Sequence, residues 1–155
     1  MPKFSIKPLS AVPDALAACI GWAAREWGDD SGFSEADWRE EFARVQRDPV
    51  DEIFVAMAGD LPVGMAWMLE QEEIESHTHL RPWLSALVVD SAHRDTGVAG
   101  ALMRHVEQYA HLGGDDRLFL LTDAPGIYFT HGWQVHDTTH VYDRPVYVME
   151  KSVAA

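Results

Sequence analysis

The stretch from Leu84 to Leu102, with the sequence LSALVVDSAHRDTGVAGAL, most constrains the fold of this chain of 155 residues. Its apolar first part belongs to a buried strand predicted over residues 83–89, and a polar loop follows. A helix predicted over residues 97–111 then places four apolar side chains on one face: Val98, Leu102, Val106 and Tyr109. A buried strand that runs through a loop into such a helix is typical of a sheet covered by helices, so the chain is predicted to be an α/β (α+β) protein.

The rest of the chain supplies further strands and helices of the same kind. Alternating or apolar runs predict strands over residues 3–7, 52–58, 63–70, 117–121, 132–136 and 145–151. Helical spacing, Pro13 near a first turn and a capping pattern from Ser34 to Asp37 predict helices over 13–27, 34–45 and 125–131, with a loop at 28–32. We find no repeat and no linker, so we expect one domain over residues 1–155 with helices on both faces of its sheet.

The charge balance limits the classes of partner. The chain carries 25 acidic and 12 basic side chains, for a net charge of −13. Nucleic acids and anionic membranes are bound by basic surfaces, so we expect neither as a partner. The excess of acid suits a cationic small molecule or a basic peptide, or it serves solubility alone.

The cysteine count and the apolar runs bear on the compartment. The single cysteine, Cys19, excludes an internal disulfide and suits a reducing compartment, and helical spacing places it on an apolar helix face. No stretch approaches a signal peptide or the roughly 20 apolar residues of a membrane helix. We therefore expect a cytoplasmic protein.

The start of the helix predicted at residue 97 has the chemistry of an anion site. A helix N-terminus leaves about four backbone N–H groups without partners in the helix and carries about half a positive charge. Gly97, Ala99 and Gly100 are small enough for a phosphate to approach the backbone, and the guanidinium of Arg94 suits phosphate. The alternative is a tight strand-to-helix turn without a ligand. No Gly-Lys-Ser/Thr follows, which excludes the Walker loop, and Arg94 replaces the first glycine of the dinucleotide fingerprint.

Two motifs in the second half of the chain resemble one family. Arg94-x-x-Gly97-x-Ala99, after an apolar strand, resembles the Arg/Gln-x-x-Gly-x-Gly/Ala pyrophosphate motif of the Gcn5-related N-acetyltransferase (GNAT) superfamily. The segment GIYFTHGW at residues 126–133 resembles the family's Phe-Tyr-x-x-x-Gly-Phe segment, and residues 144–151 resemble the last strand of small bacterial members. The resemblance covers the whole chain in element order and is sharpest over residues 84–151.

The resemblance implies a fold and a cofactor. The fold is a single GNAT-like domain with a central mixed sheet of six to seven strands, splayed middle strands and about four helices. Acetyl-CoA is expected as co-substrate, in the cleft where the strand ending at Val89 diverges from the strand at 117–121. The residues expected to bind it are Leu87, Val88, Val89, Arg94, Asp95, Thr96, Gly97, Val98, Ala99 and Gly100.

The resemblance also implies a reaction. An amine attacks the thioester directly, a backbone N–H near Val88 or Val89 polarises the carbonyl, and Tyr128 protonates the departing thiolate. The acceptor is a primary amine of a small molecule or peptide, and the residues expected around it are Trp27, Asp30, Phe33, Trp83 and Ser85.

Several assignments stay open at this point. The proton of the amine could go to Glu70, Glu72, His79 or a chain of waters, and Tyr128 could be a core aromatic instead of an acid. Asp95 stands where the family usually has glycine; aspartate tolerates positive φ, but its charge disfavours a diphosphate. The missing base and Asp95 keep open a non-catalytic acyl-CoA-binding or sensing module, or a general anion-binding fold.

Two further expectations concern metals and assembly. The closest histidine pairs are His77 with His79 and His136 with His140, but zinc sites need three or four ligands, and the chain has one cysteine and no His-Glu-x-x-His helix. We therefore expect no metal. Pairing of the last strands between two subunits could form a homodimer.

Overall fold

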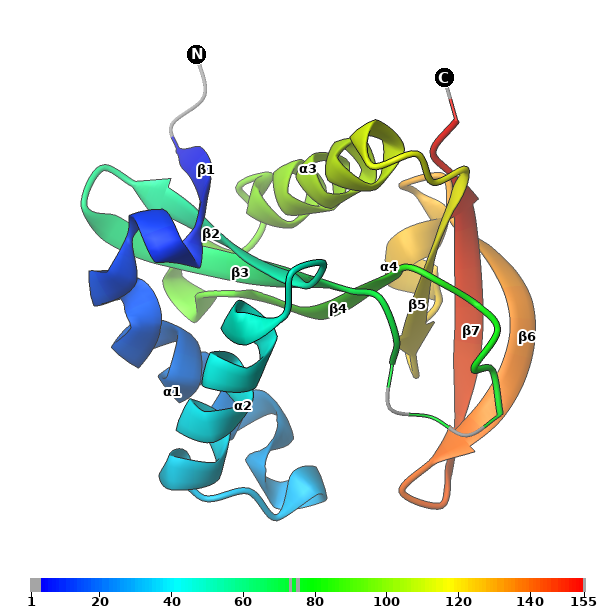
Figure 1. Ribbon diagram of the computed structural model, residues 1–155, viewed down its shortest axis with the longest axis horizontal. Coiled ribbons are helices and arrows are strands. Elements are labelled where there is room, and N and C mark those ends of the chain that lie inside the picture. The colour runs from blue at the N-terminus through cyan, green and yellow to red at the C-terminus, as the bar shows by residue number, and fades with distance from the viewer. Residues whose placement is uncertain (1–3, 73, 75, 155) are drawn as a thin grey trace.

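A seven-stranded mixed sheet runs through the protein (Figure 1). The computed structural model describes residues 4–72, 74 and 76–154, so Lys3, the predicted start of the first strand, lies outside the described residues. The strands are β1 (Ser5–Pro8), β2 (Glu52–Ala58), β3 (Leu61–Leu69), β4 (Trp83–Val89), β5 (Arg117–Thr122), β6 (Gln134–Val141) and β7 (Arg144–Ser152). Their order in the sheet is β1-β2-β3-β4-β5-β7-β6, with β4 and β5 parallel and the other neighbours antiparallel. The outer edges are therefore β1 and β6.

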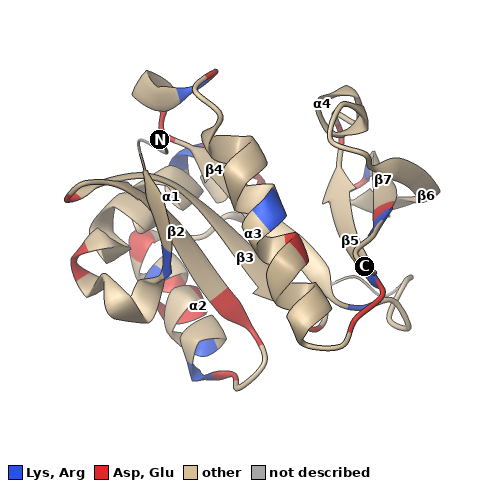
Figure 2. Ribbon diagram, turned by 90° about the horizontal axis from the view of Figure 1, so that it is seen from above, with Lys and Arg blue, Asp and Glu red and all other residues tan. Residues whose placement is uncertain are grey.

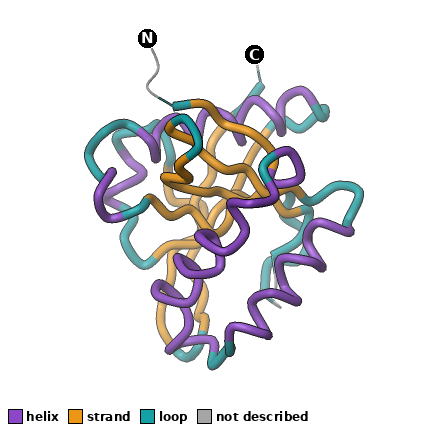
Figure 3. Tube along the Cα trace, turned by 90° about the vertical axis from the view of Figure 1, so that its left-hand side faces the viewer, coloured by secondary structure: helices purple, strands orange, loops and turns teal. Residues whose placement is uncertain are grey.

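Four helices cover the two faces of this sheet. They are α1 (Leu16–Ser31), α2 (Glu35–Arg47), α3 (Val98–Leu112) and α4 (Gly126–Phe129), and Figure 3 shows the short turn that joins α1 to α2. Ser34 and Asp37 form the predicted capping box: each side chain accepts a hydrogen bond from the backbone N–H of the other. Short 3-10 turns stand at Leu9–Ala11, Pro13–Ala15 and Ser91–His93.

Two element boundaries differ from the sequence-based prediction. Helix α1 does not end at Trp27 but continues through the predicted loop to Ser31, because the left-handed residue that ends it is Gly32, with φ 72°, whose N–H bonds to Gly28 O. Strand β6 was predicted over 132–136, yet it runs to Val141. It forms a hairpin with β7 through Tyr142 and Asp143, both at positive φ, and these two residues give no strong turn signal in the sequence.

Each face of the sheet has its own apolar core. Helices α1 and α2 close a core with β2, β3 and β4 that includes Cys19, Phe42 and Trp83, each 0% exposed. Helix α3 closes the other core, around Leu102 and Leu118. Cys19 therefore has the buried position that its helical spacing predicted.

A glycine in β3 sets how closely α3 lies on the sheet. A Cβ atom on Gly64 would lie 3.0 Å from the Val88 carbonyl oxygen and 3.0 Å from Val98 Cγ1. Such contacts are too short for ordinary packing, so only glycine lets the first turn of α3 lie this close to β3 and β4. This close approach fixes the N-terminus of α3 beside the end of β4.

Strands β4 and β5 diverge after one point of contact. Their register contains a single pair, Trp83 with Phe119, and the Phe119 N–H donates to Pro82 O at 3.1 Å. Beyond this pair β4 bonds to β3 and β5 bonds to β7. Figure 2 shows the result from above, with β4 and α3 in one half and β5, β6, β7 and α4 in the other. The expected splay of the middle strands is thus confirmed.

The described helices are too short or too polar to span a bilayer. None of those in the described residues has the length and apolar character needed to cross a membrane.

Candidate active site

The loop between β4 and α3 presents a row of backbone N–H groups. Asp95 and Gly97 both take positive φ, 62° and 88°, and this turns the chain so that Gly97 becomes the N-cap of α3. No side chain caps the helix, so the first N–H groups of α3 have no partner within it. Residues 94–97 are exposed, and a Cβ on Gly97 would meet nothing within 4 Å. The N-terminus of α3 is therefore open to an anion, and Asp95 tolerates the left-handed conformation as predicted.

This N-terminus forms the floor of a hollow that we call the cradle. The cradle is lined by nine of the ten residues expected to bind the cofactor, together with side chains from α1, α3 and the α4 region: Glu26, Leu87, Val88, Val89, His93, Arg94, Asp95, Gly97, Val98, Ala99, Gly100, Arg104, Ile127 and His131. Thr96 is the exception, because its hydroxyl turns back and donates to His93 O. The segment thus gathers as expected, with Thr96 holding the loop.

Charges of both signs line the cradle. Arg94 Nη2 lies 3.4 Å from Glu26 Oε1 on α1, and its Nε donates weakly to Val89 O at 3.5 Å. Arg104 adds a second positive charge, and Asp95 and Glu26 add two negative charges. An anion entering the cradle would meet the helix N-terminus and both arginines, and it would compete with Glu26 for Arg94.

A bulge in β4 lies between the cradle and the opposite face. On β3 the step from Met65 to Trp67 covers two residues, whereas their partners on β4, Val88 and Ser85, are three residues apart. The extra residue falls at Ala86–Leu87, and Ala86 takes φ 50°. A bulge interrupts the ladder of hydrogen bonds and leaves backbone groups unpaired. It therefore exposes β4 backbone just where β5 has separated from it.

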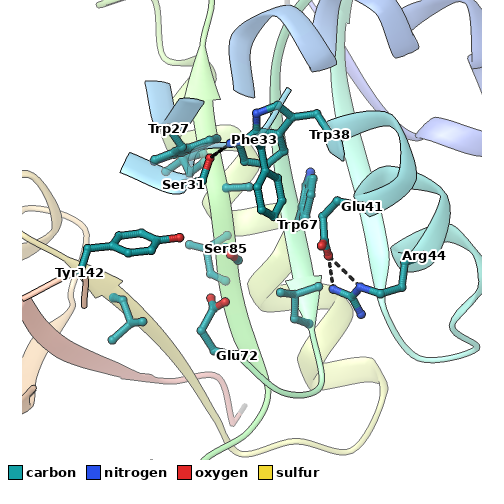
Figure 4. Close-up of a pocket in the computed structure, with 15 residues that line it drawn as sticks. Trp27, Ser31, Phe33, Trp38, Glu41, Arg44, Trp67, Glu72, Ser85 and Tyr142 are labelled. Atoms are coloured by element: carbon teal, nitrogen blue, oxygen red, sulfur yellow. Dashed lines mark hydrogen bonds and ion pairs between the residues drawn. The ribbon is translucent and has the colours of Figure 1, made fainter. Parts of the chain in front are cut away.

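A second hollow, the acceptor hollow, lies on the α1/α2 face and has a volume of about 310 Å³. It is lined by Trp27, Ser31, Phe33, Trp38, Glu41, Arg44, Trp67, Leu69, Glu72, Leu84, Ser85, Ala86, Leu87, Leu121 and Tyr142 (Figure 4). Both hollows include Leu87, so they meet at the bulge of β4.

Three of the five residues expected around an acceptor line this hollow, namely Trp27, Phe33 and Ser85. Asp30 lines a neighbouring hollow and is ion-paired there with Arg144.

Trp83 is a correction to the sequence-based prediction. Its side chain is 0% exposed, its indole Nε1 donates to Leu80 O at 2.8 Å, and its ring packs against Phe119 with centroids 5.7 Å apart. The strand begins with this residue in the core beneath α1 and α2, so Trp83 cannot contact an acceptor.

Tyr128 is half-buried beside the cradle. It packs against the α3-side core, and its ring meets Trp133 edge-on with centroids 6.4 Å apart. Its neighbours Ile127 and His131 line the cradle, but Tyr128 itself does not. Burial raises the pKa of the Tyr128 hydroxyl, and the negative charge of Asp123 raises it further. The hydroxyl therefore stays protonated at neutral pH, as an acid must.

The structure separates the three side chains that could accept a proton. Glu72 lines the acceptor hollow. Glu70 is ion-paired with Arg81 at 2.5 Å, and His79 is exposed and stacks on His77, and neither lines the acceptor hollow.

The lining residues that were not foreseen as part of a site include Trp38, Glu41, Arg44 and Trp67. Trp38 lies in the helix predicted over 34–45, and helical spacing does not distinguish a core tryptophan from one at the edge of a hollow. The helical period from Trp38 to Glu41 places them on one face, but only the packing of α2 against β3 brings that face to Trp67.

One histidine of each pair considered for a metal is hydrogen-bonded to a carboxylate. His77 Nε2 hydrogen-bonds Asp137 at 2.9 Å, and His136 Nδ1 hydrogen-bonds Glu150 at 2.6 Å. Across residues 4–72, 74 and 76–154, no three His, Cys, Asp or Glu side chains are grouped so that they could hold a metal ion.

Comparisons with known proteins identify the family and the fold. A sequence profile of the Acetyltransferase (GNAT) family matches residues 16–133. No curated protein matches the chain in sequence. Among solved structures, an aminoglycoside 6'-N-acetyltransferase complexed with coenzyme A is 16% identical with a TM-score of 0.79 (97% of this chain and 98% of that one). The aminoglycoside 6'-N-acetyltransferase from Enterococcus faecium is 18% identical with a TM-score of 0.74, over the same shares.

A third neighbour is a spermidine N-acetyltransferase chimera from Vibrio cholerae and hSSAT. It is 13% identical with a TM-score of 0.75, covering 98% of this chain and 96% of that one. At these identities the three structures show that the fold is shared.

Proposed function

The chain belongs to the GNAT acetyltransferase family, and from this premise we propose that it is an acetyl-CoA-dependent N-acetyltransferase acting on a primary amine of a small molecule or peptide. One observation carries the proposal: the cradle on one face and the acceptor hollow on the other meet at Leu87, at the bulge where β4 has left β5. A group bound through phosphates in the cradle could reach an amine held on the opposite face only at such a point.

The cradle suits a diphosphate in its chemistry. The free N–H groups of residues 97–100 point the positive end of α3 at an anion, and Arg94 can donate two parallel hydrogen bonds to phosphate once it leaves Glu26. The carboxylates of Glu26 and Asp95 oppose this and reduce the affinity. Bound there, acetyl-CoA would supply an activated acetyl group as a thioester. The CoA complex of a protein with the same fold supports this assignment.

The transfer itself makes one bond and breaks one bond. The ammonium nitrogen loses two protons, one before attack and one after it; sulfur gains one proton, and one is released to water. The amine nitrogen bonds to the carbonyl carbon, and the carbon–sulfur bond breaks. A backbone N–H of Val88 or Val89, next to the bulge, stabilises the negative charge on the carbonyl oxygen. Glu72 receives the proton of the amine, directly or through water. It is chosen because it lines the acceptor hollow, whereas the other candidate bases, Glu70 and His79, do not. Tyr128 gives its proton to the departing sulfur.

The acceptor is proposed to be a small cation. The hollow carries Glu41, Glu72 and Arg44, one more negative charge than positive, and its volume of about 310 Å³ lies at the small end for ligand sites. Aromatic walls and carboxylates both favour an ammonium group. The acceptors named for the structural neighbours, aminoglycosides and spermidine, are also amines.

The test combines binding with turnover. The protein is titrated with CoA by calorimetry, then incubated with acetyl-CoA and a panel of amines while released thiol is measured. We expect binding of CoA and thiol release that depends on an amine. The Tyr128→Phe variant should lose about 100-fold in kcat with little change in CoA affinity. Binding without turnover on any amine would instead identify a non-catalytic acyl-CoA-binding module, and a failure to bind CoA would leave only a general anion site.

Two expectations stay predictions. A cytoplasmic location rests on composition. A homodimer formed by pairing of the last strands would use β6, because β7 lies between β5 and β6 inside the sheet.

A further inference from the structure

We propose that the imidazole of His131 is a phosphate-binding group of the cradle and that it takes up a proton when CoA binds. The affinity for CoA then falls as the pH rises through the neutral range. The inference rests on the proposed function, since it adds a cofactor-binding residue to the same cradle.

The first evidence is the charge of the cradle. Its two arginines, Arg94 and Arg104, are matched by two carboxylates, Glu26 and Asp95. The chain as a whole has a net charge of −13. A diphosphate stays ionised throughout the neutral range, so its entry leaves the cradle with an excess of negative charge. A side chain that gains a positive charge near neutral pH would offset this excess, and histidine is the residue type that does so.

Two histidines line the cradle, and their surroundings differ. His93 Nδ1 lies 3.3 Å from Asp90 Oδ2, and hydrogen bonds from His93 and Trp22 lower the pKa of Asp90. An ionised carboxylate therefore already faces His93 and offsets a charge on its ring. His131 is half-buried, and among the residues that the structure describes its imidazole forms neither a hydrogen bond nor an ion pair. A phosphate that binds here would be the first anionic partner of this ring.

The ring of His131 lies over the first turn of α3. A Cβ atom on Gly100 would lie 3.2 Å from His131 Cε1, 3.8 Å from His131 Nδ1 and 3.3 Å from Arg104 Nη1. The imidazole and the guanidinium thus converge on the helix turn whose backbone N–H groups face the cradle. An anion at this turn meets both side chains as well as the positive end of the helix, and a charged imidazole binds phosphate more strongly than a neutral one.

Main-chain contacts hold His131 in this place. Its backbone N–H donates to Tyr128 O at 3.0 Å, and its carbonyl oxygen accepts a hydrogen bond from Lys151 Nζ at 2.7 Å. Lys151 also pairs with Glu107 Oε1 on α3 at 2.8 Å, so β7 ties residue 131 to the helix that it covers. The ring is therefore placed at the cradle before any ligand arrives.

The charges around this ring decide the sign of the pH dependence. The charged side chains that line the cradle or anchor residue 131 are Glu26, Arg94, Asp95, Arg104, Glu107 and Lys151. Three are positive and three are negative, so they largely offset one another, and the incoming diphosphate shifts the balance toward negative charge. Negative charge favours the imidazolium form, so the bound state holds more protons than the free state. By linkage, CoA then binds more tightly at lower pH.

Calorimetry in buffers of different ionisation enthalpy measures the proton directly. The ligand is dephospho-CoA, because the 3′-phosphate of CoA itself titrates near pH 6 and would add its own protons to the balance. At pH 7 we expect an uptake of about half a proton per ligand bound, and Kd should rise about fivefold from pH 6 to pH 8. An uptake near zero, or a Kd that does not rise with pH, would overturn the inference.

Three histidine variants assign the proton to one ring. His131→Gln keeps a polar side chain that cannot be charged, so the uptake should vanish and Kd should rise about fivefold at pH 6 but little at pH 8. A loss of affinity that is equal at both pH values would show a merely structural role. His111→Gln is the control, because this exposed histidine lies in the last turn of the same helix and outside the cradle. His93→Gln should retain the uptake; its loss there, with uptake kept in His131→Gln, would assign the proton to His93 instead.

A spectroscopic measurement separates this inference from the activity. In the ¹H–¹³C spectrum of the imidazole groups at pH 7.5, CoA should move the His131 signal toward the imidazolium position, and His131→Gln identifies that signal. If an amine releases thiol from acetyl-CoA while CoA binds with neither proton uptake nor this movement, the inference is wrong and the proposed function stands. If both are observed and no amine releases thiol, His131 binds phosphate as inferred and the proposed catalysis fails. A protein that does not bind CoA at all would refute both.

Discussion

The cradle and the acceptor hollow meet at Leu87, yet they are built in different ways. Most of the cradle comes from one continuous segment, residues 87–100, and its binding groups are backbone N–H groups placed by two positive φ angles. The acceptor hollow takes single side chains from α1, α2, β3, β4, β5, the loop after β3 and the β6–β7 turn. A local backbone site tolerates changes in most side chains, whereas an assembled hollow changes its ligand whenever one wall changes.

The largest effect should come from a side chain of the assembled hollow. Glu72→Gln removes the proposed proton acceptor and the negative charge that draws the ammonium, so kcat/KM for the amine should fall by about 100-fold or more. The affinity for CoA, measured by calorimetry, should stay unchanged because Glu72 does not line the cradle. Glu70→Gln is the matched control: the same change two residues away, on a side chain paired with Arg81 outside the acceptor hollow. Equal losses in both variants would remove Glu72 from the reaction.

In the cradle, the most informative substitution is one that changes the backbone conformation, because backbone N–H groups form the site. Gly97 has φ 88°, and an alanine there would have to leave this conformation or hold it under strain. We expect Gly97→Ala to weaken CoA binding by about tenfold in a calorimetric titration, because the first N–H groups of α3 turn away from the phosphates.

The same helix offers a control with the same strain. Gly114, just past the C-terminal end of α3, has φ 95°, and a Cβ there would also meet nothing within 4 Å. Gly114→Ala and Gly97→Ala should each destabilise the protein by about 1 kcal/mol in urea unfolding. Only Gly97→Ala should weaken CoA binding; weakening by Gly114→Ala as well would mean that the loss reflects stability alone.

Breaking the ion pair between Arg94 and Glu26 in the cradle should have a smaller effect, and it should tighten CoA binding instead of weakening it. Glu26→Gln frees Arg94 and removes a negative charge from the cradle, so CoA should bind about two- to fivefold more tightly, the size of an exposed ion pair. Raising the salt concentration should shrink the difference between variant and wild type. Glu35→Gln, which breaks the exposed Arg39–Glu35 pair on α2, should leave CoA binding as it is. Weaker binding in Glu26→Gln would show that the pair orders Arg94 for the phosphates instead of competing with them.

The contrast between the cradle, built from one segment, and the acceptor hollow, assembled from many, also explains which parts of the site could be predicted from the sequence. Hydrophobic periodicity and turn residues predicted most strands and helices correctly. The segment from Arg94 to Gly100 could be predicted because all of its parts are neighbours in the chain. The bulge at Ala86 and Leu87 was not foreseen, since alanine and leucine carry no signal for it. Trp83 lies on the α1/α2 face of the sheet, as does the acceptor hollow, but it is covered by the core and packed against Phe119. The alternation of a strand gives the face of a side chain and not how deeply it is covered, so the sequence could not exclude Trp83 from the site.

Of the residues that the family resemblance implied around an acceptor, only Trp27, Phe33 and Ser85 line the acceptor hollow. Its other walls depend on which helix crosses which strand. Trp38 and Trp67 are 29 positions apart in the chain and become neighbours of one hollow only when α2 lies on β3. Hydrophobic spacing assigns both side chains to the core, and it cannot show that they border one hollow.

The smallest predicted effect concerns the loop that carries Glu72. His77 Nε2 donates to the exposed carboxylate of Asp137 on β6 at 2.9 Å, and the hydroxyls of Ser76 and Thr139 are hydrogen-bonded at 2.7 Å. These two contacts help hold this wall of the hollow. The hydrogen bond with His77 lowers the pKa of Asp137, and the backbone N–H of Thr138 lowers it further. Because the folded pKa lies below the unfolded one, this contact stabilises the fold above an unfolded pKa of about 3.9 and is lost as the pH falls through the folded pKa.

Asp137→Asn should therefore have a slightly lower Tm than wild type at neutral pH, and the two melting curves should converge as the pH falls below about 3.9. The effect is small because the carboxylate is exposed. Asp60→Asn, on the exposed turn between β2 and β3, is the control and should follow wild type throughout. In the same comparison Asp137→Asn should raise KM for the amine slightly and leave CoA affinity unchanged, since the loop borders the acceptor hollow and not the cradle. A shift in CoA affinity instead would show that the two hollows are mechanically coupled across β4, and that the division drawn between them does not hold.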